Sequence, residues 1–566
     1  MNDPATLSFD GREIPFRDGA TIAAALLAAG ELGLRHGRQG DRRGVFCGMG
    51  VCQECLVEVD GRPAQRACMT AARAGMRVVS QPALPRLTTV AAVAGAQESV
   101  RRCELLVIGG GPAGLSAAAI AADAGLDVVL VDERTKLGGQ YFKQPAVAGT
   151  GPPPDAQFAA GRALIERTIA AGVEVRNGLQ VWGAFGLDAV CAVGAGARWR
   201  FVCDALILAP GAYERAVPFP GWTLPGVMTT GAAQTLWRSY GVAPGRRILV
   251  SGNGPLNMQV AAELGEGGAT IVGLAELAER PVPRRLPALT RMALADPTLI
   301  HGGLRYRAKL ARARVPVMYG SVVVRVDGDD RARSAVVMAV DQAGRRLAGS
   351  ERRFDVDAVC LGFGFVPSTD IARALGCRHE VFTPGGDLVT VASERGATSH
   401  EGVWVVGDGS GIRGARHAQA HGELAGLDAA RSLKGSIGEP LARRERVALR
   451  AAARHLHFQR GLADVFGAPH HQDELAGPDT PICRCEGVTR AAIERALDGG
   501  AGHVGAIKRV TRAGMGPCQG RYCGPVIAAM TARSTGQALG ELSGFAPAPP
   551  VKPIEIGALL ERPGCR

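Results

Sequence analysis

Short apolar runs that lead straight into glycine turns dominate the middle of the chain. Residues 105–108 (Leu-Leu-Val-Ile) form one such run, an Ala-rich stretch continues to about Ala124, and a second run occupies 128–131. Continuous apolar runs are typical of strands buried on both faces, and their alternation with helices is typical of a parallel α/β sheet. The pattern therefore predicts two strands here, with a helix between them.

Other segments extend this pattern toward both ends of the chain. Residues 205–209 and 402–408 are further strand candidates, and each ends at a glycine corner. Residues 7–16 are typical of a hairpin and residues 21–29 of a helix, so the N-terminal unit differs from the α/β region. A Pro- and Ala-rich linker over residues 80–102 is expected to join the two.

The turn after the first apolar run carries a dinucleotide-binding fingerprint. Gly109, Gly111 and Gly114 permit the tight turn, the close approach of a pyrophosphate and the close packing of the next helix. Asp132 ends the second strand, where a carboxylate can accept hydrogen bonds from ribose hydroxyls. Strand, glycine turn, helix, second strand and acid occur in the required order, so the sequence predicts a bound nucleotide at this turn.

A second, altered fingerprint follows in the middle of the chain. An apolar strand over residues 247–251 leads to Gly252 and Gly254, but Asn257 stands where the third glycine is expected. The position 23 residues after Gly252 is an alanine, and the nearest acid is Glu276. The pattern leaves open a dissociable NAD(P), a tightly held nucleotide and a structural remnant without a ligand.

Composition excludes several classes of protein. The chain has 566 residues, enough for several domains, and its 78 glycines show no three-residue period, while 46% of residues are hydrophobic; collagen-like and disordered chains are therefore excluded. The net charge is +12, but no basic tract or aromatic platform indicates nucleic-acid binding. No apolar run is long enough to span a bilayer, so a cytoplasmic protein with 14 reduced cysteines is expected.

The first group of cysteines has the spacing of a plant-type [2Fe–2S] loop. Cys47, Cys52, Cys55 and Cys68 follow the pattern C-x4-C-x2-C-x12-C, and glycines among them allow backbone N–H groups to approach cluster sulfurs. The alternative is a four-cysteine zinc site, whose ligands usually come as two separated pairs. The spacing favours the iron–sulfur cluster.

A second group lies near the C-terminus. Cys483 and Cys485 precede a predicted helix over residues 490–497, and Cys518 and Cys523 follow it, so four thiolates can close a tetrahedral site. Spacing alone leaves zinc and iron–sulfur open. The isolated cysteines, which are predicted to be buried hydrophobic residues, are Cys103, Cys191, Cys203, Cys360, Cys377 and Cys565. The histidine pairs, which have no carboxylate partner at catalytic spacing, are His417 with His421 and His470 with His471.

With these residues identified, the chain resembles two-dinucleotide flavoprotein reductases. That resemblance implies that Asp408 holds the ribityl chain of FAD and that the helix beginning near Ala415 faces the flavin ring. Such reductases carry a redox cysteine pair soon after the first acid, but residues 137–142 contain none. Further candidate cofactor-binding residues beside these motifs are Pro112, Ala113, Glu133, Gly139, Gln140, Ala209, Gly211, Gly407 and Asp408, and the second fingerprint contributes Gly252 and Gly254.

Three longer stretches narrow the resemblance. Residues 212–228, 362–367 and 514–523 are similar to the α subunits of heteromeric amine and imino-acid oxidoreductases, a group that includes opine oxidase, hydroxyproline or proline dehydrogenase, hydrogen cyanide synthase and sarcosine oxidase. The last stretch resembles the bacterioferritin-associated-ferredoxin domain, which favours [2Fe–2S] over zinc there, although its final cysteine spacing departs from the simplest version. The chain stops after a Pro-rich tail, so the folate-binding half of sarcosine oxidase α is not expected.

The resemblance implies a multidomain α/β and α+β fold. We expect a β-grasp-like ferredoxin, two interleaved Rossmann-like FAD and NAD(P) domains of the disulfide-oxidoreductase type, and a helical cluster domain. The expected divisions are residues 1–98 (ferredoxin and linker), 99–215 with 355–440 (FAD domain), 216–354 (second nucleotide domain), 441–535 (helical linker and cluster domain) and 536–566 (tail).

A flavin exchanges two electrons, whereas each [2Fe–2S] cluster carries one, so the cofactors predict an electron splitter or relay. The leading hypothesis is an electron-transfer subunit that works in a heteromeric complex with a separate flavin-containing β subunit, which oxidises a small secondary amine or amino acid. No catalytic acid or base is evident in the sequence. The alternatives are a self-sufficient NAD(P)H-dependent reductase and an iron-storage or cluster-handling partner, although the latter leaves FAD unexplained.

Overall fold

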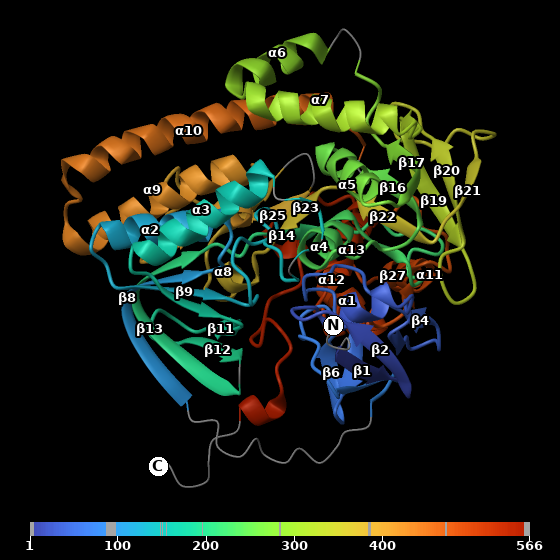
Figure 1. Ribbon diagram of the computed structural model, residues 1–566, viewed down its shortest axis with the longest axis horizontal. Coiled ribbons are helices and arrows are strands. Elements are labelled where there is room, and N and C mark those ends of the chain that lie inside the picture. The colour runs from blue at the N-terminus through green and yellow to red at the C-terminus, as the bar shows by residue number, and fades with distance from the viewer. Residues whose placement is uncertain are drawn as a thin grey trace.

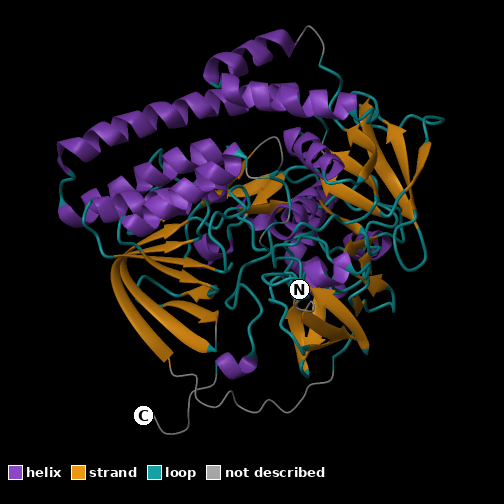
Figure 2. Cartoon of the chain, in the orientation of Figure 1, coloured by secondary structure: helices purple, strands orange, loops and turns teal. Residues whose placement is uncertain are grey.

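The computed structural model shows two nucleotide-binding units, two small cysteine-rich units and a helical layer that covers them (Figures 1 and 2). His470, His471 and Cys565 lie outside the residues that the structure describes. Those residues are 5–85, 98–147, 149, 151–153, 155–194, 196–281, 285–382, 386–469 and 473–559.

The N-terminal unit is a five-stranded sheet with one helix against it, in the strand order β2-β1-β7-β5-β6. The Thr21 side chain accepts a hydrogen bond from the Ala24 N–H at 3.3 Å and so caps the helix. The predicted hairpin and helix are confirmed. The elements are β1 (Ala5–Phe9), β2 (Arg12–Phe16), α1 (Ile22–Ala28), β3 (Arg35–His36), β4 (Arg42–Arg43), β5 (Leu56–Val59), β6 (Arg62–Arg66) and β7 (Arg77–Ser80).

The first nucleotide unit is built on a seven-stranded sheet with the order β10-β9-β8-β13-β12-β11, and β26 pairs with β13. Both predicted strands and the helix between them are present. Residues 98–102, expected as linker, instead begin β8, because this strand extends along β13 beyond its apolar end. The elements are β8 (Glu98–Ile108), α2 (Pro112–Asp123), β9 (Val128–Asp132), α3 (Ala156–Ala170), β10 (Glu174–Asn177), β11 (Gln180–Ala184), β12 (Val190–Gly194), β13 (Ala197–Leu208), β26 (Val403–Val405), η2 (Gly407–Ser410) and α9 (Ala415–Lys434).

Helices α2 and α9 pack closely because glycines stand at their contact. A Cβ atom on Gly422 would lie 2.1 Å from the carbonyl oxygen of Ala113, and one on Gly426 would lie 2.5 Å from that of Ala117. Since Ala113 belongs to the first glycine turn, this contact also fixes the position of the turn.

We expect Gly422→Ala to lower the free energy of unfolding by about 1–3 kcal/mol, because the added methyl group forces the two helices apart. Gly265→Ala, in the helix Pro255–Glu266 (α5), is the matched control, since the nearest neighbour of its added Cβ would be a side-chain carbon at 3.7 Å. Thermal unfolding of both variants tests the difference. An equal midpoint for the two variants would contradict the close contact.

The second nucleotide unit is a parallel five-stranded sheet in the order β15-β22-β16-β17-β18, with a three-stranded antiparallel sheet beside it. Residues 355–440 were expected in the FAD domain, but β22 pairs with β15 and β16 and so belongs here. The elements are β15 (Val227–Thr229), α4 (Thr230–Tyr240), β16 (Arg247–Gly252), α5 (Pro255–Glu266), β17 (Thr270–Glu276), β18 (Val317–Tyr319), β19 (Ser321–Asp327), β20 (Ser334–Ala339), β21 (Arg352–Asp355) and β22 (Ala358–Gly362).

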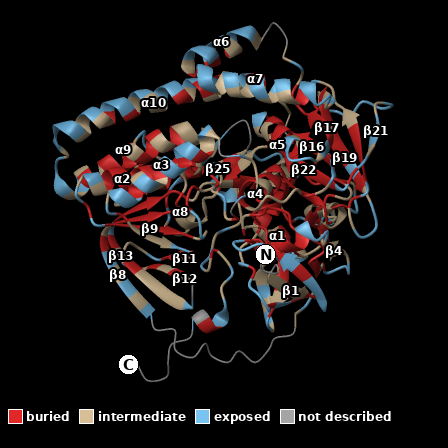
Figure 3. Ribbon diagram, viewed as in Figure 1, coloured by how far each residue is buried: buried red, intermediate tan, exposed pale blue. Residues whose placement is uncertain are grey.

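A layer of long helices lies over both nucleotide units (Figure 1). Its outer face is exposed, whereas the strands nearest to it are mostly buried and the far ends of β8 and β13 are half-buried or exposed (Figure 3). Helices α6 (Leu286–Ala295), α7 (Pro297–Arg312) and α10 (Gly438–Val465) form the layer. The short elements between the two units are β14 (Ala212–Glu214), β23 (Phe365–Pro367), α8 (Asp370–Ala374), β24 (His379–Phe382) and β25 (Asp387–Thr390).

The C-terminal cysteine-rich unit is mainly helical and packs against the N-terminal unit (Figure 1). The tail then passes between the N-terminal unit and the first nucleotide sheet, where the Val551 N–H donates to the Trp182 carbonyl at 2.7 Å. No helix among the described residues is long and apolar enough to cross a membrane. The elements are β27 (Pro481–Cys483), β28 (Val488–Thr489), α11 (Arg490–Asp498), α12 (Val504–Thr511), α13 (Cys523–Thr535), η3 (Glu541–Ser543) and η4 (Ile556–Ala558).

Candidate functional site

A cavity of about 1250 Å³ runs from the first glycine turn to the second. Small-ligand pockets usually occupy about 300–1,000 Å³, so this cavity has room for an extended dinucleotide. Residues of both cysteine-rich loops also reach its wall: Met49 and Val51 from the N-terminal loop, and Arg521 from the C-terminal loop. The cavity therefore borders both predicted cluster sites.

The first glycine turn has the shape that a pyrophosphate requires. Gly109 has φ +110°, and a Cβ on Gly114 would lie 1.8 Å from the Gly109 carbonyl oxygen, so neither position accepts a side chain. A Cβ on Gly111 would meet only the Gly139 Cα, at 3.8 Å, and Gly111 precedes α2 without a side-chain cap. The first N–H groups of α2 are thus available to an anion.

Two neighbouring acids that the sequence assigns to this nucleotide have different surroundings. Asp132 accepts hydrogen bonds from the N–H groups of Gly110 (2.5 Å) and Arg134 (2.7 Å), so it braces the turn while lining the cavity. Glu133 instead forms ion pairs with Arg66 at 2.5 Å and with Lys552. Burial would raise the pKa of Glu133, but Lys552 and Arg66 lower it to about 2.

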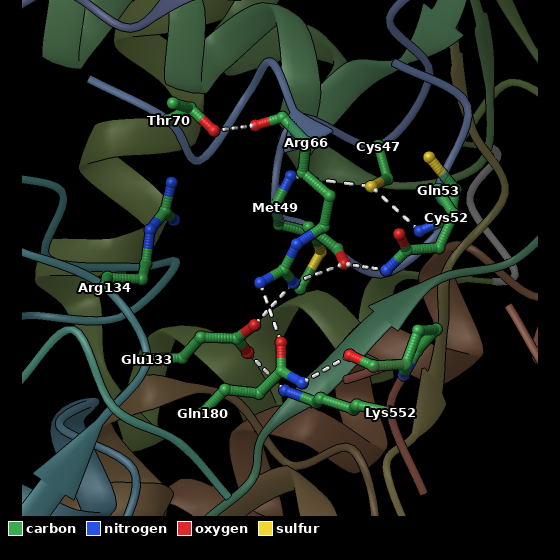
Figure 4. Close-up of polar contacts among 12 residues, drawn as sticks. Cys47, Met49, Cys52, Gln53, Arg66, Thr70, Glu133, Arg134, Gln180 and Lys552 are labelled. Carbon is green, nitrogen blue, oxygen red and sulfur yellow. Dashed lines mark hydrogen bonds and ion pairs between the residues drawn. The ribbon is translucent and has the colours of Figure 1, made fainter. Parts of the chain in front are cut away.

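Figure 4 shows that Glu133 lies where three parts of the chain meet. Arg66 comes from the N-terminal unit and also donates to Gln180 at 2.8 Å, while Gln180 donates to the Pro553 carbonyl at 2.8 Å. Lys552 comes from the tail. Glu133 therefore fastens the N-terminal unit and the tail to the first nucleotide unit, a role that sequence spacing does not reveal.

The remaining residues predicted for the first site line the same cavity, except Gly114, which packs inside the turn. Burial raises the pKa of Asp408 to about 6, and its carboxyl group lies on the cavity wall just before α9. A hydrogen-bond acceptor in that position suits a hydroxyl-bearing chain such as the ribityl chain of FAD. The predicted residues that line the cavity here, and that together fit FAD, are Pro112, Ala113, Gly139, Gln140, Ala209, Gly211, Gly407 and Asp408.

The second glycine turn is more complete than its sequence indicates. Gly254 has φ +109°, nothing lies within 4 Å of its Cβ position, and it begins α5 without a side-chain cap. Gly252 packs against the Gly362 carbonyl, and Asn257 donates to that carbonyl at 2.9 Å, so the amide occupies the place of the third glycine. Glu276 reaches the turn and accepts from the Gly254 N–H at 3.1 Å.

Sequence reasoning missed two buried titratable groups on the cavity wall. Lys143 donates to Gln234 at 2.9 Å, and Glu214 accepts from the Gly231 N–H at 2.8 Å at the beginning of α4. Burial lowers the pKa of Lys143 to about 7 and raises that of Glu214 to about 7. Glu214 lies within the stretch 212–228, which carried the resemblance but suggested no role for this residue.

The four N-terminal cysteines are buried and form two pairs. Cys47 interacts with Cys52, and Cys55 with Cys68. The Cys47 sulfur accepts from the Cys52 N–H at 3.3 Å and from the Met49 N–H at 3.5 Å. Burial would raise the pKa of Cys47, but hydrogen bonds from Cys52 and the backbone lower it, which favours the thiolate form that binds iron. This pairing suits two irons with two thiolates each.

The C-terminal cysteines are also buried and paired. The sulfurs of Cys485 and Cys518 lie 3.3 Å apart, and Cys483 interacts with Cys523. In the described parts of the chain, no three His, Cys, Asp or Glu side chains converge on a single metal position. Two pairs of thiols fit a two-iron cluster better than they fit one zinc ion.

His417 and His421 are buried on α9, with ring centroids 5.5 Å apart. Burial lowers their pKa values to about 3 and 4, so both rings are neutral. His417 lines the cavity. Neutral rings in this position contribute polarity to the wall without adding charge.

Comparison with known proteins agrees with this geometry. The family described as pyridine nucleotide-disulphide oxidoreductase matches residues 103–422, a 2Fe-2S iron-sulfur cluster binding domain matches residues 2–83, and a BFD-like [2Fe-2S] binding domain matches residues 481–533. The second cysteine group is thus assigned to [2Fe–2S], and the zinc alternative is not supported.

Several relatives cover most of the chain. Hydrogen cyanide synthase subunit HcnB of Pseudomonas aeruginosa is 33% identical over 80% of this chain and 97% of its own length. An opine oxidase subunit of Agrobacterium tumefaciens is 32% identical over 81% of this chain and 92% of its own. The crystal structure of L-proline dehydrogenase from P. horikoshii has the same fold, with a TM-score of 0.71, 20% identity and coverage of 99% and 98% of the two chains.

The glycine turns, the shared cavity and the paired cysteines agree with these matches along the chain. The protein is an oxidoreductase that contains FAD and two [2Fe–2S] clusters, and it belongs to the pyridine nucleotide-disulphide oxidoreductase family as a relative of hydrogen cyanide synthase and opine oxidase subunits.

Proposed function

We propose that the chain is the electron-transfer subunit of a heteromeric dehydrogenase or oxidase whose substrate is a small secondary amine or amino acid. One observation carries the proposal: the cavity that fits FAD is bordered by both cluster loops, and no cysteine occurs among its described lining residues. The electron acceptors that lie beside this site are therefore the two clusters rather than a redox-active thiol pair. The names of the relatives, which include opine oxidase and hydrogen cyanide synthase subunits, support the class of substrate.

The proposed residues for FAD are those of the first glycine turn together with Asp132 and Asp408; the proposed cluster ligands are the eight paired cysteines. FAD supplies the exchange between two-electron and one-electron chemistry. Within the chain, the first turn of α2 binds the pyrophosphate, and Asp408 orients the hydroxyl-bearing chain. Lys143 and Glu214 stand on the wall as groups able to hold or move a proton near neutral pH. The proposed location is the cytoplasm, because the cysteines act as thiolates.

The chain purified alone, loaded with FAD and iron, should not reduce a dye with opines, proline derivatives or glycine. Addition of a co-purifying flavin subunit should restore dye reduction. Titration with dithionite serves as the control, because it must reduce flavin and clusters in the isolated chain. Robust amine oxidation by the isolated chain would overturn the proposal.

The second glycine turn supports an alternative, a self-sufficient NAD(P)H-dependent reductase. Gly254 is open to the cavity and Glu276 reaches the turn, so a nucleotide can lie here. We expect a nucleotide to bind without reducing the flavin: NADH or NADPH added anaerobically should leave the flavin band unbleached within the catalytic time.

Calorimetric titration with NADH, NADPH or ATP measures binding at this site directly. In Gly254→Val, a side chain fills the open space and strains a backbone at φ +109°, so binding should fall at least tenfold. Rapid bleaching in the parent chain but not in this variant would favour the reductase alternative.

A further inference from the structure

The two cysteine loops touch each other through a buried ion pair. Glu54, between Cys52 and Cys55, lies 3.4 Å from Arg484, between Cys483 and Cys485. The two side chains are 0% and 4% exposed. The two predicted clusters therefore lie on opposite sides of a junction that solvent does not enter, and they are separated by few residues.

Aromatic rings fill the rest of the junction. Phe46, next to Cys47, and Tyr522, next to Cys523, meet edge to face with ring centroids 5.4 Å apart. The guanidinium of Arg484 lies 4.0 Å from the centroid of Phe46 and 4.6 Å from that of Trp222, which is fully buried. Dense packing of this kind leaves the junction rigid and dry.

The junction also carries excess positive charge. Arg35 and Arg43 join Arg484 around the carboxylate of Glu54, at 3.0 Å and 3.8 Å, and Arg43 also pairs with Asp41 at 2.6 Å, so three cations meet two carboxylates. Buried cations in a medium of low dielectric constant stabilise nearby negative charge. A [2Fe–2S] cluster with four thiolates is an anion that becomes more negative on reduction. The positive charge of the junction therefore stabilises the reduced state of either cluster.

The two loops differ in exposure. No residue from 44 to 55 is exposed, so the N-terminal loop is enclosed by the rest of the chain. In the C-terminal loop, Arg512, Met515 and Pro517 are exposed beside Cys518. The C-terminal site alone offers its loop to the surface.

We propose that the two clusters exchange electrons directly with each other across the Glu54–Arg484 junction, in series, with the N-terminal cluster internal and the C-terminal cluster facing the external protein partner. One electron leaves the reduced cluster and enters the oxidised one; no bond or proton changes. Because both loops border the cavity, the alternative is that the flavin passes electrons to each cluster separately, with no transfer between the clusters. This inference rests on the proposed function for the origin of the electrons.

Electron paramagnetic resonance of the complete holoprotein tests whether the clusters are close. Dithionite titration should give unsplit signals while one cluster is reduced and a magnetically split spectrum once both are reduced. The wild-type chain suffices for this test, and neither an amine nor a partner subunit is needed, so its failure is distinguishable from failure of the proposed function. Two additive, unsplit signals at full reduction would overturn the inference.

Loss of the C-terminal cluster tests the order. The Cys518→Ala variant, which keeps FAD and the N-terminal cluster, is reduced with dithionite and then freed from the excess. Cytochrome c is added as the electron acceptor. It should reoxidise the N-terminal cluster of this variant at least tenfold more slowly than that of the wild-type protein. Cys360→Ala, in buried β22, is the matched control and should behave as wild type. Reoxidation of the N-terminal cluster at an unchanged rate in Cys518→Ala would overturn the series arrangement.

Arg484 is a positioning residue in this scheme, and its charge has a spectroscopic readout. In half-reduced Arg484→Met, the electron should move toward the C-terminal cluster by at least tenfold in the ratio of the two signals, equivalent to 59 mV for a one-electron couple. The reason is that the guanidinium lies against Glu54 and Phe46 of the N-terminal loop, so its loss disfavours the extra negative charge on the N-terminal cluster. Arg484→Lys should restore most of the wild-type ratio. Arg512→Met removes an exposed cation from the same loop and should leave the ratio unchanged; an equal effect of Arg484→Met and Arg512→Met would contradict the role of the junction.

Discussion

A chain carrying Cys55→Ala is expected to lose the N-terminal [2Fe–2S] cluster while keeping the C-terminal one. Cys55 is fully enclosed and interacts with Cys68, so its removal leaves one iron with a single protein thiolate. No described residue of the enclosed loop 44–55 is exposed, so water does not readily replace the missing ligand. We expect half of the iron per chain and half of the spins after full reduction.

Iron analysis and spin quantitation measure this loss, with flavin content as the internal reference. Cys360→Ala is again the control, because Cys360 is equally buried but lies in β22. It should keep all the iron and the flavin. Retention of the full iron content by Cys55→Ala would mean that the four N-terminal cysteines are not the ligands of a common cluster.

Local motifs predicted the cofactors well because their chemistry depends on short spacing. The loop from Cys47 to Cys55 and the turn from Gly109 to Gly114 each place their functional groups within a few residues. Such spacing fixes which sulfurs or N–H groups can reach one ligand, whatever the surrounding fold. Helix α1 was predictable for the same reason, since its cap, Thr21, is adjacent to its apolar positions.

Contacts between distant parts of the chain were not predictable. Glu133 has the position of a nucleotide-binding acid, yet its partners Arg66 and Lys552 come from the two ends of the chain. Glu54 and Arg484 each look like an ordinary loop charge until the fold brings them together. Strand β22 is as apolar as the strands of both nucleotide units, so its sequence does not show which of the two sheets it joins. Its pairing with β16 places it in the second unit.

Glu276 shows how far a local rule can mislead. Its position one residue beyond the expected acid weakened the second fingerprint, but its longer side chain reaches the turn and accepts from Gly254. It also accepts from the Ala278 N–H at 3.0 Å, and it is 1% exposed. Burial therefore raises its pKa to about 8, which makes this acid neutral near physiological pH and gives the fold a measurable dependence on pH.

Replacing Glu276 with glutamine should remove that dependence. The folded chain holds a proton on Glu276 that the unfolded chain releases above its ordinary pKa, so wild-type stability is highest below about pH 4.5 with respect to this group and falls until about pH 8. The loss corresponds to about 5 kcal/mol. A glutamine at this position cannot ionise, but its single oxygen keeps only one of the two hydrogen bonds, at a cost of about 1 kcal/mol at every pH.

The stability curves of wild type and Glu276→Gln should therefore cross: the variant is less stable at about pH 4 and more stable at about pH 8.5, as measured by denaturant unfolding at each pH. Glu266→Gln, on the exposed end of α5, should keep the wild-type dependence. Parallel curves for wild type and Glu276→Gln would mean that Glu276 is ionised in the folded protein. In that case the second glycine turn would carry a carboxylate able to accept hydrogen bonds from ribose hydroxyls, as Asp132 can in the first turn.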